Sequence, residues 1–184
     1  MFQSKLLISN IKASFKLKST VLALQHFCQK VKPKKKNGSF FVHRHKTFVY
    51  CIYYKGHVNV TGIKRKHDLI IALSYLKQIP HVCHVKLLSI DNITCSAKLN
   101  SGIYTWSEKF SSYLKRLNKL CNGLYTIQYS PQIFPGAFLK TKLLGTIVFF
   151  ATGKFNIVGC KSFASVFKSL ITFTQLLEKL NIKW

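Results

Sequence analysis

The chain contains few side chains that could act as acids, bases or metal ligands in a reaction. Its only carboxylates among 184 residues are Asp68, Asp91, Glu108 and Glu178, and none lies within ten residues of another. Hydrolases and nucleases usually need two or three carboxylates together, to bind a metal ion or to transfer protons. The scatter of these four argues against such an enzyme unless folding brings a pair together, and we expect no catalytic residue.

The cysteines and histidines do not follow the spacing of a metal site. Six cysteines occur, and no two form the Cys-x-x-Cys pair that is typical of a zinc ribbon. The segment from His81 to His84 and the pair His43 and His45 could each supply half of a ligand set. Free thiols in a reducing compartment are the simpler interpretation, so we expect no metal and no cofactor.

The charge balance indicates a polyanionic partner. Lys and Arg number 29 against four acids, which gives a formal net charge of +25. Nucleic acid is the first partner to consider, and an anionic membrane surface is the second. Residues 143–151 form the longest apolar stretch, about half of a membrane span, and lysines interrupt the apolar runs of residues 1–18. We expect a soluble, intracellular protein without a membrane partner.

Two motifs occur twice in the same order, which indicates an internal duplication. Residues 56–64 and 153–161 both read Gly, basic, apolar, Asn, apolar, any residue, Gly, any residue, Lys. Residues 10–17 and 92–99 both begin Asn-Ile and share Ser and Lys-Leu at matching places. We therefore divide the chain into repeats at residues 1–83 and 84–184, with the boundary near Pro80.

Each repeat is expected to form a strand, a helix, several strands and a second helix. Apolar and polar residues alternate after Gly56 and after Gly153, as in a half-buried strand that follows a hairpin turn. This alternation places Asn59 and Asn156 opposite the apolar face. Helical spacing of apolar residues predicts helices that begin near four polar residues, Ser19, Asp68, Ser107 and Ser162. The basic loop at residues 32–38 fits a solvated linker and a phosphate-contacting arm equally well.

The motifs of the second repeat resemble those of the TATA-binding protein family. The family shows Phe-Pro-Gly, an apolar strand ending in Phe, Ser-Gly-Lys and a second strand ending in Thr-Gly-Ala-Lys. The matching pieces here are Phe134-Pro135-Gly136, Phe149-Phe150, Thr152-Gly153-Lys154 and Val158-Gly159-Cys160-Lys161. The Asn-Ile-Val that opens each family repeat corresponds to residues 10–12 and 92–94.

The resemblance implies an α+β fold shaped as a saddle. Two pseudo-symmetric repeats would form one curved antiparallel sheet, with DNA on its concave face and helices on its convex face. It implies a non-enzymatic factor that binds and bends duplex DNA in the minor groove during transcription initiation, as a monomer in the nucleus. General transcription factors or the RNA polymerase machinery would be its protein partners.

The resemblance also implies which residues contact DNA. Phe134 with Phe150, and Tyr53 with Phe40 or Phe41, would be wedges between base steps, although phenylalanine is also a common core residue. Asn10 and Asn92 would lie at the centre of the site, or serve as turn or cap residues. Arg44 and Lys140 would bind phosphates. The full expected set is Asn10, Phe41, Arg44, Tyr53, Asn59, Thr61, Asn92, Thr94, Phe134, Lys140, Phe150, Asn156 and Val158.

Asn59 and Asn156 stand where the family has valines that exclude the amine of guanine. An asparagine amide carries both donors and an acceptor. We therefore expect a preferred site less strictly A·T-rich than a TATA element, unless both residues merely face solvent at a sheet edge.

Departures from the family pattern are marked. Ser130 and Gln132 replace glutamates that help to recruit transcription factor IIB, and Lys12 replaces an apolar groove residue. Such divergence suits a viral or parasite protein acting in the host nucleus. Two other functions remain open, which are a basic RNA-binding or ribosome-associated protein and the substrate-binding module of a nucleic-acid enzyme.

Overall fold

The structure, a computed structural model, describes residues 6–18, 36–37, 40–99, 106–121, 123–141 and 144–180. The strands of the first half are β1 (Leu7–Lys18), β2 (Lys36–Asn37), β3 (Phe40–His45), β4 (Phe48–Tyr53) and β5 (His57–Ile63), followed by helix α2 (Lys66–Lys77). The second half comprises β6 (His84–Lys98), α3 (Trp106–Cys121), β7 (Thr126–Gln128), β8 (Gly136–Lys140), β9 (Thr146–Phe150), β10 (Lys154–Cys160) and α4 (Phe163–Lys179).

Strand order repeats between the two halves of the chain. Within the described ranges the sheet has ten strands in the order β2-β3-β4-β5-β1-β6-β10-β9-β8-β7. The neighbours β1–β5 and β6–β10 pair antiparallel, as do the hairpins β4–β5 and β9–β10. The expected α+β class with an antiparallel sheet is confirmed. The helix expected at Ser19 and most of the basic loop at 32–38 lie outside the described residues.

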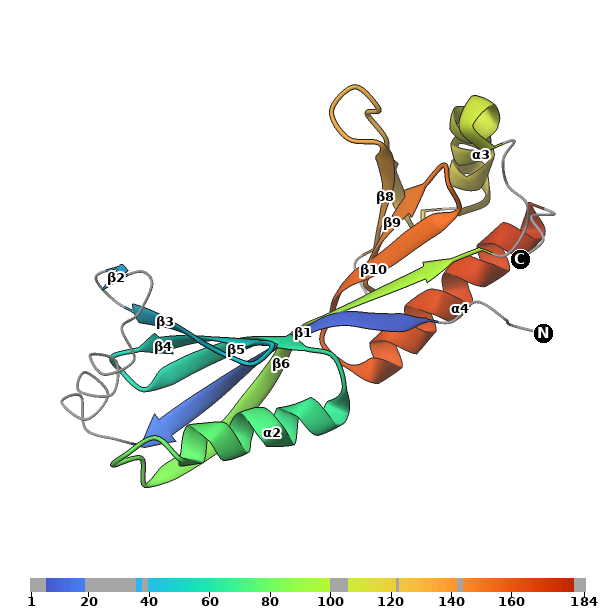
Figure 1. The fold of residues 1–184 in the computed structure, drawn as a ribbon. Helices are drawn as coiled ribbons and strands as arrows, with labels where there is room; N and C mark the ends of the chain where they lie inside the picture. The colour runs from blue at the N-terminus through green and yellow to red at the C-terminus, as the bar shows by residue number, and fades with distance from the viewer. Residues whose placement is uncertain are drawn as a thin grey trace. The chain divides into compact units, whose positions relative to one another are not determined.

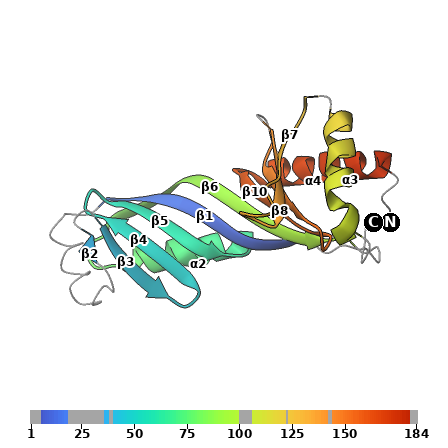
Figure 2. The same ribbon diagram turned by 90° about the horizontal axis from the view of Figure 1, so that it is seen from above.

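The chain divides into two compact units, and we describe each by itself. The N-terminal unit is Asn10–Asn92, and the C-terminal unit joins Ile93–Trp184 with Met1–Ser9. In the N-terminal unit α2 lies below its strands in Figure 1 and behind them in Figure 2. Phe15, Tyr50 and Val58 on the strands and Leu76 on this helix are completely buried. Strand residues that alternate with them point to the opposite face, as a half-buried sheet requires.

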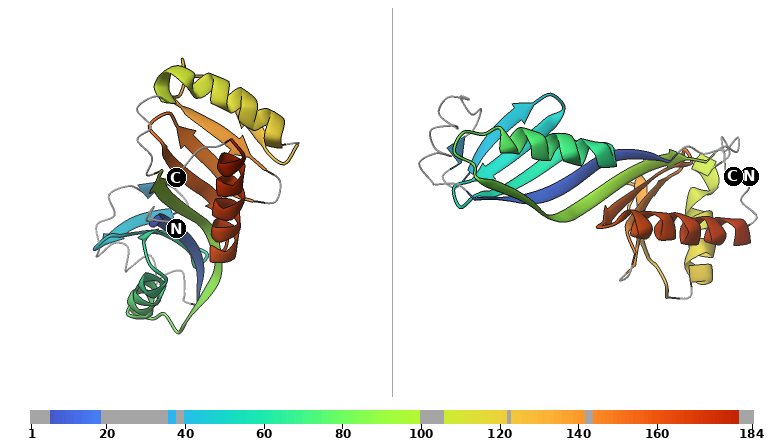
Figure 3. Two further views of the ribbon diagram at one scale, coloured as in Figure 1. Left: turned by 90° about the vertical axis from the view of Figure 1, so that its right-hand side faces the viewer. Right: turned by 90° about the horizontal axis from the view of Figure 1, so that it is seen from below.

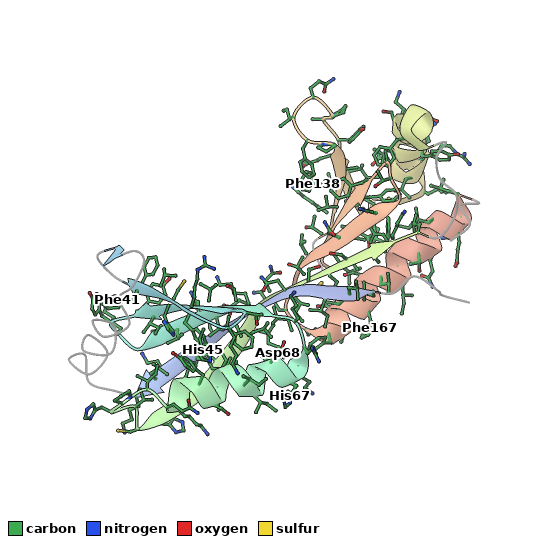
Figure 4. The ribbon with its side chains drawn as sticks, viewed as in Figure 1. Phe41, His45, His67, Asp68, Phe138 and Phe167 are labelled. Carbon is green, nitrogen blue, oxygen red and sulfur yellow. The ribbon has the colours of Figure 1, made fainter. Side chains whose placement is uncertain are left out.

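Helix α2 begins three residues before the position that the sequence predicts. Arg65 is its N-cap residue, and Asp68 is the third residue of its first turn rather than the cap (Figure 4). The Asp68 carboxylate accepts the backbone N–H groups of Lys64 and Arg65 at 3.0 and 3.1 Å. A carboxylate at this position accepts hydrogen bonds from backbone N–H groups that have no partner within the helix. Its negative charge also interacts favourably with the positive end of the helix dipole.

The core of the C-terminal unit is aromatic. The ring of Phe149 lies 5.4 Å from that of Phe110 on α3 and 5.4 Å from that of Phe173 on α4. Phe155 on β10 also contacts Phe173, at 5.1 Å. Figure 3, left, shows both helices in front of strands β8, β9 and β10. These contacts hold both helices against the same face of the strands, and Phe149 points into the core between them.

Helix α4 begins at the predicted residue, but one of its apolar residues faces solvent instead of the core. Ser162 is the N-cap and accepts the backbone N–H of Ser165 at 3.1 Å. Phe167 is one of the apolar residues whose helical spacing predicts this helix, yet it is 56% exposed (Figure 4), whereas Ser169 is fully buried. The Ser169 hydroxyl donates to the Ser165 carbonyl at 2.8 Å and accepts from the Gly145 N–H at 3.0 Å. Burial of this serine costs little because its hydrogen bonds are made.

Both predicted hairpin glycines occupy the left-handed backbone region. Gly56 has φ +78° and Gly153 has φ +75°, where a side chain would be strained. The N–H of Gly56 donates to the Tyr53 carbonyl at 2.8 Å, and that of Gly153 donates to the Phe150 carbonyl at 2.9 Å. The two turns are thus built in the same way, and each places an aromatic residue at the end of its strand.

A cluster of histidine and tyrosine rings joins β3 to α2. His43 and His45 both stack on Tyr75, with ring centroids 5.6 and 4.1 Å apart, and His43 Nε2 lies 2.5 Å from the Tyr75 hydroxyl. Burial lowers the pKa of His43, and the neighbouring His45 lowers it further. The fold therefore favours the neutral imidazole of His43.

We predict that this unit loses stability as the pH falls below about 6.5, the ordinary pKa of histidine. The unfolded chain takes up a proton on His43 there, while the folded chain resists it, so protonation favours unfolding. Urea titrations at pH 7.5 and 5.5 measure the effect. The His43→Gln variant should show a smaller pH dependence than the wild type, and an equal dependence in the two proteins would contradict the prediction.

Candidate nucleic-acid interface

The sheet face opposite the helix carries a polar row in the N-terminal unit. We call this side of each unit its open face. Ser14 on β1 lies beside Asn59 on β5, which lies beside Cys51 on β4, which in turn lies beside Val42 on β3. All four side chains are partly exposed. Asn59 therefore occupies the open face, as the strand alternation predicts.

The C-terminal unit repeats this row at corresponding positions. Ser96 on β6 lies beside Asn156 on β10, followed by Val148 on β9 and Phe138 on β8. Serine and asparagine therefore recur at the same two places. Val148 is nearly buried, because aromatic rings cover this end of the row.

Three phenylalanine rings gather on the open face of the C-terminal unit. The ring of Phe134 lies 5.8 Å from that of Phe150 and 5.2 Å from that of Phe138, and Phe134 is 37% exposed. Gly136 lies beneath the rings, since a Cβ atom there would approach Phe134 Cε1 to 2.7 Å and Phe150 Cε1 to 2.9 Å. The glycine of the Phe-Pro-Gly motif therefore allows the rings to close together. The structure brings Phe134 and Phe150 together as predicted and adds Phe138.

In the N-terminal unit the aromatic pair is Tyr53 with Phe40. Their ring centroids are 5.2 Å apart, and the two residues are direct partners across β3 and β4. Of the two residues left open for this pair, Phe40 is the one that faces Tyr53, so the choice of Phe41 for the expected contact set is wrong. Phe41 lies opposite Ile52, is 6% exposed and packs against Tyr54, so it belongs to the buried side (Figure 4). Consecutive strand residues point to opposite faces, and only one of two adjacent phenylalanines can pair with Tyr53.

Asn10 supports a bulge in the neighbouring strand. Its Oδ1 accepts the backbone N–H of Gly62 at 2.7 Å, at a place where the register between β1 and β5 shifts. Gly62 has φ +88°, and a Cβ atom there would meet the Thr47 carbonyl oxygen at 2.1 Å. The acceptor of Asn10 is thus used within the fold, which leaves its NH₂ group to donate outward.

The remaining predicted contacts are also partly exposed. Thr61 pairs with Val49, and Val158 pairs with Thr146 at the corresponding place of the other unit. Asn92 and Thr94 lie on either side of the buried Ile93, so they share one face of β6. The predicted contact set is therefore brought to the open faces, with Phe40 in place of Phe41.

Exposed cations lie on the same strands as the aromatic residues. Arg44 and Lys140 occupy matching strand positions and are exposed. The Lys140 ammonium donates to Gln128 Oε1 at 2.9 Å and lies 5.9 Å above the ring of Phe138. Lys98 and Lys154 lie side by side across β6 and β10.

The thiols of the described residues are free, and most of them are buried away from solvent. Cys95, Cys121 and Cys160 are buried, and burial with the nearby Cys160 raises the pKa of Cys95 to about 11. Cys51 is partly exposed, and burial raises its pKa while the neighbouring Lys12 lowers it. In the part of the chain that the structure describes, no three His, Cys, Asp or Glu side chains gather as a metal site, and no helix is long and apolar enough to cross a membrane.

Comparison with known proteins gives the family. The family model "Transcription factor TFIID (or TATA-binding protein, TBP)" matches residues 88–180, which is half of the chain. The chain belongs to the TATA-binding protein family. A search of curated proteins gives no match. The solved structure "Methanococcus jannaschii TBP" superimposes with a TM-score of 0.72 over 95% of this chain and 99% of that chain, at 19% sequence identity. At this identity the superposition shows a shared fold.

Membership of the family bears on whether the chain is an enzyme. TATA-binding proteins are DNA-binding transcription factors without enzymatic activity, which agrees with the scatter of the four carboxylates. Sequence reasoning missed Phe138 and Ser14, and it left Phe40 as an alternative to Phe41. Strand parity could have identified Phe138 and Ser14, because each shares a face with a residue that was predicted.

Proposed function

We propose that this protein binds duplex DNA through the open faces of its two units and bends it at the minor groove during transcription initiation. The observation that supports this most is the pairing, in each unit, of an exposed aromatic group with a polar row. Phe150, Tyr53 and Phe40 stand at the ends of their strands, with Phe134 packed on Phe150 from the turn before β8, and the neighbouring strands carry asparagine and serine.

Exposed aromatic rings are costly on a free surface and useful in a stacked helix of bases. A ring placed between two base pairs replaces base stacking with ring stacking, and the resulting kink allows more of the duplex to contact protein. Phe134 suits this role because it lies in a turn and remains exposed, while its neighbour Phe150 supports it from β9.

The charge supplies affinity without sequence preference. Each Lys or Arg that contacts a phosphate releases a condensed counterion, and the released ions favour binding. With a formal charge of +25, the protein has more cations than such an interface uses. Arg44 on β3 and Lys140 on β8, at matching strand positions, are the proposed phosphate contacts in the two units.

The cellular role follows from the family. We propose that the protein acts in the nucleus as a monomer on DNA, with general transcription factors or RNA polymerase as partners. Ser130 and Gln132 lack the charge of the family glutamates, so a factor IIB-like partner would need other contacts. A viral or parasite origin, with the host nucleus as the place of action, stays a prediction from divergence.

Competition between nucleic acids tests the function. Labelled duplex DNA should be displaced by unlabelled duplex DNA at lower concentration than by duplex RNA or by single strands. The minor groove of A-form RNA is already wide and shallow, so a protein can contact it without a wedge. Stronger competition by RNA would instead favour a ribosome-associated or RNA-binding role.

A further inference from the structure

A carboxylate lies next to the polar row of the N-terminal unit. The Ser14 hydroxyl oxygen is 2.5 Å from Asp91 Oδ2 and 2.9 Å from Asn59 Oδ1. The other oxygen of Asp91 accepts the Ser89 hydroxyl at 2.6 Å. Asp91 is one of only four acids in the chain, and it lies beside a surface that we propose binds DNA.

The single proton of Ser14 can serve only one of its two neighbours. An ionised carboxylate only accepts hydrogen bonds, and a hydroxyl bound to it is drawn to about 2.5–2.7 Å, which is the distance found. The proton of Ser14 therefore goes to Asp91. Ser14 can then meet Asn59 only as an acceptor, so the Asn59 group nearest to it must be the NH₂ group. The separation of 2.9 Å suits N–H···O better than O–H···O.

The two ends of an asparagine amide have nearly the same shape, and their hydrogen bonds decide which end lies where. If the NH₂ of Asn59 donates to Ser14, its carbonyl oxygen must lie on the side away from Ser14. We infer that Asp91, acting through Ser14, turns Asn59 so that a hydrogen-bond acceptor faces DNA, and that this acceptor selects the amine of guanine. The inference rests on the proposed binding of duplex DNA at the open face.

The orientation of the Asn59 amide determines which base pair it can bind in the minor groove. A·T pairs present only acceptors there, whereas G·C adds the N2 amine of guanine as the one donor. An acceptor held outward on Asn59 therefore pairs with guanine and opposes the acceptors of an A·T pair. Asp91 and Ser14 are positioning residues, and Asn59 makes the contact.

The other unit lacks this constraint at the corresponding place. Sequence positions that differ by 82 relate Ser9 to Asp91 and Ser96 to Ser14. The hydroxyls of Ser9 and Ser96 are hydrogen-bonded to each other, and either can be the donor. Ser96 can therefore donate to or accept from Asn156, which can turn to suit A·T or G·C. Selection of guanine should be confined to the base pair that Asn59 contacts.

Inosine provides the probe. Inosine lacks only the N2 amine of guanine, so an I·C pair presents the minor groove with acceptors alone. Selection from randomised duplexes first yields the preferred site, and each G·C pair in it is then replaced by I·C. We expect one position at which the replacement weakens binding by about 2- to 10-fold, the range of one neutral hydrogen bond.

Two reciprocal variants test the cause. Asp91→Ser copies the arrangement of the other unit and should abolish the difference between the G·C and I·C duplexes, while the lost negative charge strengthens binding to both. Ser9→Asp should create the same constraint on Asn156 and make a second position sensitive to inosine. The readout is the ratio of the affinities of one variant for the G·C and I·C duplexes. Partial unfolding of the variant lowers both affinities equally and does not change this ratio.

The outcomes separate this inference from the proposed function. Tight duplex binding with equal affinity for I·C and G·C at every position would overturn the inference and leave the function intact. A ratio unchanged by Asp91→Ser would overturn the role of Asp91. Failure to bind any duplex would remove the proposed function and the inference with it.

Discussion

Raising the salt concentration from about 50 to 200 mM should weaken duplex binding by about 10³- to 10⁵-fold, if the protein contacts about 6–10 phosphates. The physical reason is the release of counterions from DNA, which is favourable in dilute salt and is lost as the bulk concentration rises. A protein with 29 cations and four acids has the charge for such a number of contacts.

Fluorescence anisotropy of a labelled duplex at several salt concentrations gives the slope. The Lys140→Gln and Arg44→Gln variants should each reduce the slope by about one phosphate contact, because each removes one proposed ion pair. Lys77→Gln on α2, on the opposite side of the sheet, is the matched control and should leave the slope unchanged. A nearly flat salt response of the wild type would exclude the nucleic-acid function.

Replacing Phe149 with alanine should destabilise the fold by about 3–5 kcal/mol, the usual cost of deleting a buried phenylalanine ring. Phe149 is 1% exposed and packs between Phe110 and Phe173. The same change at Phe134 removes a partly exposed ring and should cost much less. Urea denaturation of the two variants measures the difference, and equal losses would contradict the assignment of faces.

In DNA bending, the Phe134 variant should show the larger effect, although the Phe149 variant loses more stability. The kink of TATA-binding protein is about 80°. Energy transfer between dyes on the ends of a short duplex should report a strong bend with the wild type. Phe134→Ala should reduce the bend, and Phe149→Ala should retain it at temperatures where the variant is folded. A straight duplex in the wild-type complex would rule out the wedge.

Much of the fold could be predicted because the chain repeats its local signals. The hairpin glycines Gly56 and Gly153 and the alternation after them are local features, so both hairpins were predicted correctly. Ser162 is a preferred cap residue and marked the start of α4. At α2 the cap is Arg65, outside the preferred set, so the acid in the first turn was mistaken for the cap.

The errors in the site arose where the outcome depends on distant partners. Phe40 and Phe41 are identical in type, and only the register across the Lys46–Thr47 turn decides which of them faces Tyr53. Phe167 fits the apolar stripe of α4, but the contact of Ser169 with Gly145 decides the rotation of the helix. The contact of Ser14 with Asp91 joins residues 77 positions apart, and no local pattern indicates it.

The most direct test of the account asks whether DNA covers the open face, and two cysteines provide it. Cys51 lies in the polar row beside Asn59 and is partly exposed, whereas Cys83 is exposed in the segment that links α2 to β6. Because burial raises the pKa of Cys51, alkylation is carried out at mildly alkaline pH, which increases the reactive thiolate, and its rate is first measured on the free protein. Mass spectrometry with and without saturating duplex DNA measures each site. We predict that DNA protects Cys51 and leaves Cys83 reactive, and equal reactivity of Cys51 with and without bound duplex would contradict the account.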